Sequence, residues 1–378
     1  MQTLTLKELI RRQTEVFQAE KDGFKLYPNA KYVFTKERAE EFSRVTLETL
    51  IDDPYFLGMK DFIWPKVKDH LLLLEEERKK RLIHTVGIFG AIGISKTSRF
   101  SILNYWQLFN LLINPDLNKH YDMIPNTATA LIILSKDAAA SKKVTFRDLL
   151  PKINNSPFIR DYFPPHVDVE KLDNNPSKLP SELRFPKNVL IFPGTGHAAS
   201  ILGYNVFGGG LDEVNDMQYT EHSKKAANKE YYSAAESAYN ETLDRINSRF
   251  PRQKLYKDKK VTGFLALVGQ ARHPNSFSEK IIKTYRALGD ESGMFVTSDS
   301  WWDVHPATDF SAETFYFDKT IKRPIEQVYK RHVELGKCIC GTELKDWAYL
   351  GNGGIKVCSI DCYQLTYGGR NETDKVQY

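Results

Sequence analysis

A glycine-rich segment at residues 87–98 carries the residue types that bind phosphate groups. It reads Gly-Ile-Phe-Gly-Ala-Ile-Gly-Ile-Ser-Lys-Thr-Ser and joins an apolar strand to a helix that we expect from Arg99 to about Leu112. The segment differs at one position from a phosphate-loop signature, because Ser95 stands where the last glycine is usual. Small residues let the backbone wrap around phosphates with its N–H groups pointing inward, and the start of the helix adds a partial positive charge.

This pattern predicts that a nucleotide binds along the loop. Lys96 would reach the β- and γ-phosphates and serve in catalysis, and the hydroxyl of Thr97 would bind Mg²⁺. An ordinary glycine turn between a strand and a helix is the alternative interpretation. The predicted nucleotide-binding residues are Gly90, Ala91, Ile92, Gly93, Ile94, Ser95, Lys96, Thr97 and Ser98.

Two adjacent carboxylates, Asp212 and Glu213, follow an apolar stretch at residues 206–211. Phosphate-loop enzymes hold Mg²⁺ through one carboxylate and often use a second group to orient the attacking water. We expect Asp212 to contribute to the metal site and Glu213 to act as the catalytic base. A plain acidic strand end would look the same, and three glycines at 208–210 weaken the strand pattern. The two motifs in this order nevertheless indicate an ATPase with ATP and Mg²⁺ as cofactors.

Apolar runs that alternate with helical patterns would position these motifs. Near-continuously apolar strands between helices favour a mainly parallel sheet that is covered on both faces. The predicted fold class is therefore α/β, a phosphate-loop NTPase with a mainly parallel central sheet flanked by helices. The expected strands are 85–89, 127–135, 189–193, 206–211, 261–269 and 294–297, and the expected helices beyond the phosphate loop are 137–150 and 277–288.

The ends of the chain differ from this core, which predicts three parts. Residues 1–80 form a helical N-terminal segment with amphipathic pieces at Leu4–Glu20 and Lys36–Ile51, as a lid or adaptor of the ATPase. Residues 81–324 form the ATPase core. Residues 325–378 form a small Cys-rich C-terminal tail.

Composition limits the class of protein. The chain has 378 residues, of which 41% are hydrophobic and 12% aromatic, so it can bury a substantial core. The segment Met1–Lys21 is polar and unlike a signal peptide, and no apolar run approaches the length of a membrane span. The net charge of +5 is compatible with a polyanionic partner, but an ordinary solvated surface would give the same value.

In the order of its motifs, the stretch from about residue 50 to 320 resembles the ATPase domain of the large terminase subunit of tailed bacteriophages, the motor that packages DNA into procapsids. The loop Gly90–Thr97 is similar to the Walker A segment of that family, and Leu211–Asn215 is similar to its Walker B segment. Val268–Phe277 resembles its coupling motif. Further similar segments are 155–158, 162–164, 183–189, 200–205, 300–306 and 315–317.

The resemblance implies a motor subunit that hydrolyses ATP and translocates double-stranded viral DNA in the host cytoplasm, away from membranes. Its implied partners are double-stranded DNA, the portal protein, the small terminase subunit and sibling copies in a ring on the portal. Gly269 and Gln270 would form the coupling element that senses the γ-phosphate, although a solvated strand-end amide is an equal alternative for Gln270. Another phosphate-loop translocase or helicase-like ATPase, or a degenerate ATPase that serves as a DNA-binding scaffold, are the alternative functions.

The chain departs from the family at several positions. Ser95 replaces a glycine, Gly269-Gln270 stands where the coupling motif usually begins with Ser or Thr, and Leu202 stands where a basic residue is frequent. An arginine finger is therefore unassigned; its candidates are Arg99, Arg160 and Arg272, each also interpretable as a surface or structural arginine. Residues 325–378 are too few for the C-terminal nuclease domain of the resembling proteins, so we expect no nuclease activity.

All four cysteines lie in the tail, at Cys338, Cys340, Cys358 and Cys362. Two close pairs separated by a loop can form a tetrahedral four-thiolate Zn²⁺ site, although the spacings are looser than the common C-x₂-C. Four reduced thiols without a metal are the alternative. The run Cys358–Tyr363 also resembles the zinc-binding start of some HNH-type homing endonucleases, which suggests that an inserted element interrupts the reading frame.

Overall fold

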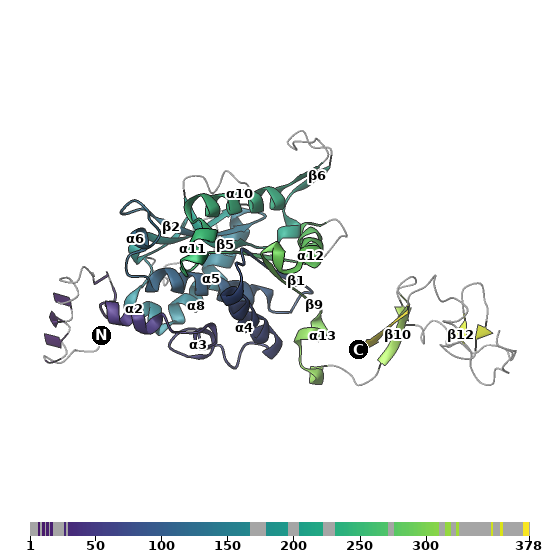
Figure 1. Ribbon diagram of the computed structural model, residues 1–378. Helices are drawn as coiled ribbons and strands as arrows, with labels where there is room; N and C mark the ends of the chain where they lie inside the picture. Colours follow the sequence, from purple (N-terminus) through teal and green to yellow (C-terminus); the bar gives the residue numbers. More distant parts are fainter. Residues whose placement is uncertain are drawn as a thin grey trace. The chain divides into compact units, whose positions relative to one another are not determined.

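The computed structural model describes residues 26–27, 29–166, 179–195, 204–221, 231–270 and 276–309, together with a few helical or strand positions elsewhere (Figure 1). The chain divides into two compact units, Met1–Val304 and His305–Tyr378. The domain borders that we expect at residues 80 and 324 stay predictions.

A seven-stranded sheet forms the centre of the first unit, with the strand order β3-β4-β2-β5-β8-β1-β9. All neighbouring strands are parallel except β3 and β4, which are antiparallel. This arrangement confirms the predicted mainly parallel α/β sheet. The strands are β1 (Thr85–Gly90), β2 (Thr129–Ser135), β3 (Leu183–Phe185), β4 (Val189–Thr195), β5 (Asn205–Leu211), β8 (Leu265–Gly269) and β9 (Met294–Asp299).

Helices cover both faces of this sheet, because alternate residues of each strand point to opposite faces (Figure 1). On β2, Leu131 and Ile133 join the core that contains the long helix α5 (Lys96–Ile113), whereas Ile132 and Leu134 join the core under α10 (Ala234–Arg249) and α12 (Phe277–Leu288). The first core also holds α2 (Lys36–Phe42), α3 (Leu47–Asp52), α4 (Pro65–Lys80), α8 (Leu150–Asn155) and α9 (Pro157–Tyr162).

Several expected elements have different bounds. The stretch Lys36–Ile51 forms two helices, because the side chain of Thr46 accepts a hydrogen bond from the N–H of Thr49 and starts α3 anew. The expected helix 137–150 consists of α7 (Ala138–Lys143), a π-helical segment (Val144–Leu149) and α8. Helix α10 is not among the predicted elements. Shorter elements are α6 (Leu117–His120), β6 (Tyr219–Glu221), β7 (Tyr231–Ser233), α11 (Arg252–Lys257) and α13 (Trp301–Val304).

In the second unit the described strands form one three-stranded sheet and one strand pair. The sheet has the order β11-β10-β14 and the pair is β12-β13. Their bounds are β10 (Thr314–Asp318), β11 (Arg323–Pro324), β12 (Tyr349–Leu350), β13 (Lys356–Val357) and β14 (Thr373–Gln377). The four cysteines of the predicted zinc site lie outside the described residues, as do Leu202 and Arg272.

Within the described part of the chain, no helix is long and apolar enough to cross a membrane. Over the same residues, no group of three or more His, Cys, Asp or Glu side chains is arranged to hold a metal ion.

Candidate nucleotide-binding site

The glycine-rich loop joins the end of β1 to the start of α5 and needs glycine at two positions. Gly90 has a φ of +133°, and a Cβ atom placed there would overlap the carbonyl oxygen of Asp299. Gly93 has a φ of +84°. Side chains other than hydrogen are strained in this region of backbone space, so both positions favour glycine.

Ser95 adopts a left-handed conformation, with φ of +60° and ψ of +28°, immediately before the first residue of α5. This is the backbone conformation that glycine adopts most easily. The serine therefore keeps the loop geometry of a glycine, at a strain of about 1–2 kcal/mol for a residue with a Cβ atom.

Lys96 lies at the start of α5 and points back over the loop. Its Nζ donates hydrogen bonds to the carbonyl oxygen of Gly90, at 3.1 Å, and to that of Ala91. Burial and the positive charge of Arg99 lower the pKa of Lys96, and the negative charge of Asp212 opposes this shift. The loop thus holds an ammonium group close to its own backbone, where a bound phosphate would supply the missing negative charge.

Arg99 and Asp299 form an ion pair that supports the phosphate loop through hydrogen bonds to its backbone. Arg99 is only 1% exposed; its Nη1 lies 2.7 Å from Oδ2 of Asp299, and its Nη2 donates to the carbonyl of Ile94 at 3.1 Å. The carbonyl of Asp299 accepts the N–H of Ala91 at 3.1 Å. This buried ion pair supports the structural interpretation of Arg99. The sequence gives no signal for Asp299, because it reaches the loop only through the pairing of β1 with β9.

Asp212 follows the end of β5, and its N–H donates to the carbonyl of Leu134 on β2 at 2.8 Å. Burial raises the pKa of this carboxyl group to about 6, and the charge of Glu213 adds to the increase. A carboxylate that is 8% exposed and lies beside a second acid is destabilised until a cation neutralises it. Carboxylate oxygens are ligands that Mg²⁺ prefers, so the site fits the predicted metal.

Glu213 lies next to Asp212 but faces solvent. It adopts a left-handed conformation, with φ of +51°, and begins a short 3₁₀ helix, Val214–Asp216. Its Oε2 lies 3.4 Å from Nζ of Lys136, a residue that follows β2. Lys136 is absent from the sequence prediction, since only the pairing of β2 with β5 brings it to this acid.

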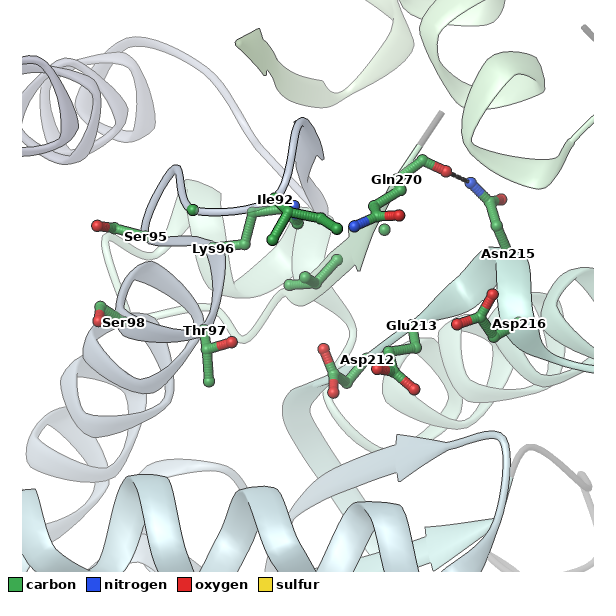
Figure 2. A pocket seen from close by; sticks show the side chains of 13 residues that line it. Ile92, Ser95, Lys96, Thr97, Ser98, Asp212, Glu213, Asn215, Asp216 and Gln270 are labelled. Carbon is green, nitrogen blue, oxygen red and sulfur yellow. Dashed lines mark hydrogen bonds between the residues drawn. The ribbon is translucent and has the colours of Figure 1, made fainter. Parts of the chain in front are cut away.

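Gln270 follows β8, which lies between the loop strand β1 and the acidic strand β5. Its carbonyl accepts a hydrogen bond from Nδ2 of Asn215 (Figure 2). The same amide donates to Oγ of Ser278 at 2.7 Å, and its Oδ1 accepts the N–H of Ser278 at 3.1 Å. Asn215 thereby connects the loop after β5, the end of β8 and the start of α12. Glycine is favoured at position 269, because a Cβ atom there would lie 2.9 Å from Cγ2 of Val214, which is closer than normal van der Waals contact.

These elements surround one cavity of about 490 Å³. In Figure 2, the hydroxyl of Thr97 and the carboxylate of Asp212 lie on facing walls. Most of the predicted site residues line it, whereas Gly90, Ala91 and Ile94 do not; Gly90 packs against Asp299, and Ile94 is buried. The lining residues are Ile92, Gly93, Ser95, Lys96, Thr97, Ser98, Asp212, Glu213, Asn215, Asp216, Val268, Gly269 and Gln270.

A family model described as the N-terminal P-loop domain of the uncharacterized protein MJ0330 matches residues 59–323. The chain belongs to this family. It therefore carries a P-loop NTPase domain, and the match covers the loop, the acid pair and Gln270 together. No curated protein matches the chain significantly.

Solved structures of phage large terminases are similar to this P-loop chain. The large terminase of bacteriophage HK97 is 14% identical with a TM-score of 0.40, and the match covers 67% of this chain and 43% of the terminase. The large terminase of a thermophilic bacteriophage is 13% identical with a TM-score of 0.38, and the match covers 62% of this chain and 45% of the terminase. A variant of the ATPase domain of a Thermus phage large terminase is 8% identical with a TM-score of 0.35, and the match covers 62% of this chain and 81% of that domain. The chain thus spans less than half the length of the first two, and identities this low concern the fold alone.

Proposed function

We propose that this P-loop domain hydrolyses ATP with Mg²⁺ and that the chain uses the hydrolysis to move double-stranded DNA. The observation that carries the ATPase part is the single cavity that Lys96, Asp212, Glu213 and Gln270 share. They come from three places in the fold, the start of α5, the loop after β5 and the end of β8, and together they supply the groups that phosphoryl transfer to water requires.

In the proposed reaction, the N–H groups of the loop and the ammonium of Lys96 bind the phosphates. The Thr97 hydroxyl and the Asp212 carboxylate would hold the metal, which would supply positive charge to neutralise the phosphates. Glu213 orients a water molecule against the γ-phosphorus and accepts its proton as the new P–O bond forms. The bond from the γ-phosphorus to the bridging oxygen breaks, and ADP and phosphate result.

The motor part of the proposal rests on the order of motifs that resembles large terminases. The contacts of Asn215 support it, because loss of the γ-phosphate beside Gln270 would be felt at the start of α12. The proposed partners are double-stranded DNA, a portal protein, a small terminase subunit and sibling copies in a ring in the host cytoplasm. A sibling copy would then provide the arginine finger. No nuclease activity is part of the proposal.

The experiment that tests this function measures ATP binding and turnover of the full chain beside Lys96→Ala and Glu213→Gln. Each protein is assayed with and without Mg²⁺ and double-stranded DNA. We expect Glu213→Gln to bind ATP like the wild type but to lose at least about 100-fold in turnover, as for other groups that act only in the transition state. Lys96→Ala should weaken ATP binding.

Glu40→Gln is the matched control, because Glu40 is an exposed residue of α2 outside the cavity. It should keep wild-type turnover. Unchanged turnover in Glu213→Gln would refute its role as the base, and absence of ATP binding in the wild type would refute the nucleotide site. Turnover that double-stranded DNA does not alter at any salt concentration would refute the motor part.

A further inference from the structure

Two tryptophans, Trp301 and Trp302, begin α13 at the edge of the sheet where the phosphate loop lies. Both are exposed, at 38% and 58%, although rings of this size are mostly buried in proteins. A Cβ atom placed on Gly93 would lie 3.4 Å from Nε1 and 3.5 Å from Cδ1 of Trp301. The indole of Trp301 therefore packs beside the backbone of the phosphate loop and keeps part of its surface open to solvent.

The position of Trp301 relative to the loop is fixed through the backbone. Asp299, two residues earlier, accepts the N–H of Ala91 and pairs with Arg99. The N–H of Ser300 donates to Oδ2 of Asp303 at 2.7 Å, which sets the start of α13. The indole thus follows closely in the chain after the Arg99–Asp299 ion pair, which supports the backbone of the loop.

The strand order gives a direction to a nucleotide on this loop. The acids after β5 and Gln270 after β8 lie on one side of β1, and β9 with α13 lies on the other. The terminal phosphate must lie toward the acids and Gln270, because those groups act on it. The sugar and the base then leave the loop on the opposite side, toward β9 and Trp301.

We propose that Trp301 is the platform on which the adenine base of the bound ATP stacks. The inference rests on the proposed nucleotide site and adds its specificity-determining residue. An indole presents a large π-face, and purines present the largest π-face among the bases, so stacking stabilises them most. Stacking on an aromatic side chain is worth roughly 5- to 150-fold in affinity.

The test compares two ligands that share three linked phosphates and differ in the adenosine, the ribose with its base. ATP carries the purine, whereas inorganic tripolyphosphate carries only the phosphates that the loop binds. Calorimetric titration with Mg²⁺ measures the affinity of the full chain for each. We expect Trp301→Ala to weaken ATP binding roughly 5- to 150-fold while tripolyphosphate affinity stays within about 2-fold. Trp301→Phe should restore most of the ATP affinity, since a phenyl ring still stacks.

Trp302→Ala is the matched control; it removes an exposed indole from the neighbouring position and should leave both affinities unchanged. Tripolyphosphate affinity reports on the phosphate loop alone, so a variant that keeps the wild-type value has an intact loop. Equal weakening of both ligands in Trp301→Ala would overturn the inference, because the indole would then only support the loop. Unchanged ATP affinity would overturn it as well. A wild-type chain that binds neither ligand would overturn the proposed nucleotide site and the inference with it.

Discussion

Replacing Asp212 with asparagine should stabilise the protein while it removes Mg²⁺-dependent turnover. Burial raises the pKa of Asp212 from the usual 3.8 to about 6, and Glu213 adds to the increase. The folded chain therefore holds this proton more tightly than the unfolded chain does. The negative charge opposes folding wherever the unfolded carboxyl has ionised and the folded one must follow.

The sign and size of this cost follow from the two pKa values. The cost is absent below about pH 4, grows as the pH rises toward 6, and is complete above that. Each pH unit between the two values is worth about 1.4 kcal/mol, which gives about 3 kcal/mol at pH 8. Asparagine has the same shape and does not ionise, so Asp212→Asn avoids this cost. For a domain of this size the gain corresponds to roughly 5 to 10 °C in melting temperature.

Thermal unfolding of the wild type and Asp212→Asn, at pH 8 and pH 4.5 without nucleotide, measures the effect. The control is Asp61→Asn, an exposed carboxylate whose removal should change stability by less than about 0.5 kcal/mol. Addition of Mg²⁺ and ATP should narrow the difference at pH 8, because the cation neutralises the wild-type acid. A variant that is less stable than the wild type at pH 8, or equally stabilised at both pH values, would refute the argument.

Two further substitutions test the loops that surround the cavity. Asn215→Asp keeps an oxygen for the N–H of Ser278 but loses the amide that donates to the carbonyl of Gln270. We therefore expect kcat for ATP to fall by about 10-fold or more while KM stays nearly constant. Steady-state kinetics measures both constants, and equal changes in kcat and KM would contradict this. Ser95→Gly should raise the free energy of unfolding, measured by urea titration, by up to about 1 kcal/mol. The backbone strain of the left-handed serine exceeds the extra conformational entropy that glycine gives the unfolded chain. A loss of stability would show that the serine side chain holds the loop.

The parts of the fold that depend on short linear patterns could be predicted from the sequence. The loop before α5 and the acid pair after β5 have recognisable spacings, and the apolar runs of β1, β2 and β5 were expected nearly as found. The strand predicted at 261–269 is shorter, because Phe264 donates its N–H to the side chain of Gln107 and not to a neighbouring strand. Hydrophobicity alone does not distinguish such a buried extended segment from a ladder.

Helix α10 has a sequence pattern that does not predict a helix, for a different reason. Its buried face near the start consists of Ala234, Ala235 and Ala238, which are small and give a weak apolar signal. The ion pair of Arg99 is likewise beyond the sequence pattern, because its partner Asp299 is 200 residues away in the chain. Lys136 likewise meets Glu213 only because β2 pairs with β5. Contacts of this kind depend on strand order, which spacing along one sequence does not contain.

Strand order also decides which groups can act on one another in the proposed reaction. The order along the sheet is β5, β8, β1, β9, whereas the order along the chain is β1, β5, β8, β9. Because β8 lies between β5 and β1 in the sheet, Gln270 lies between the phosphate loop and the acids and also contacts Asn215. If β8 added at the outer side of β9, the same residues would form the loop and the acid pair, but no side chain would join them to α12. A change at the γ-phosphate could then alter the acids without reaching that helix, so in the proposed motor the position of β8 is what would link hydrolysis to movement.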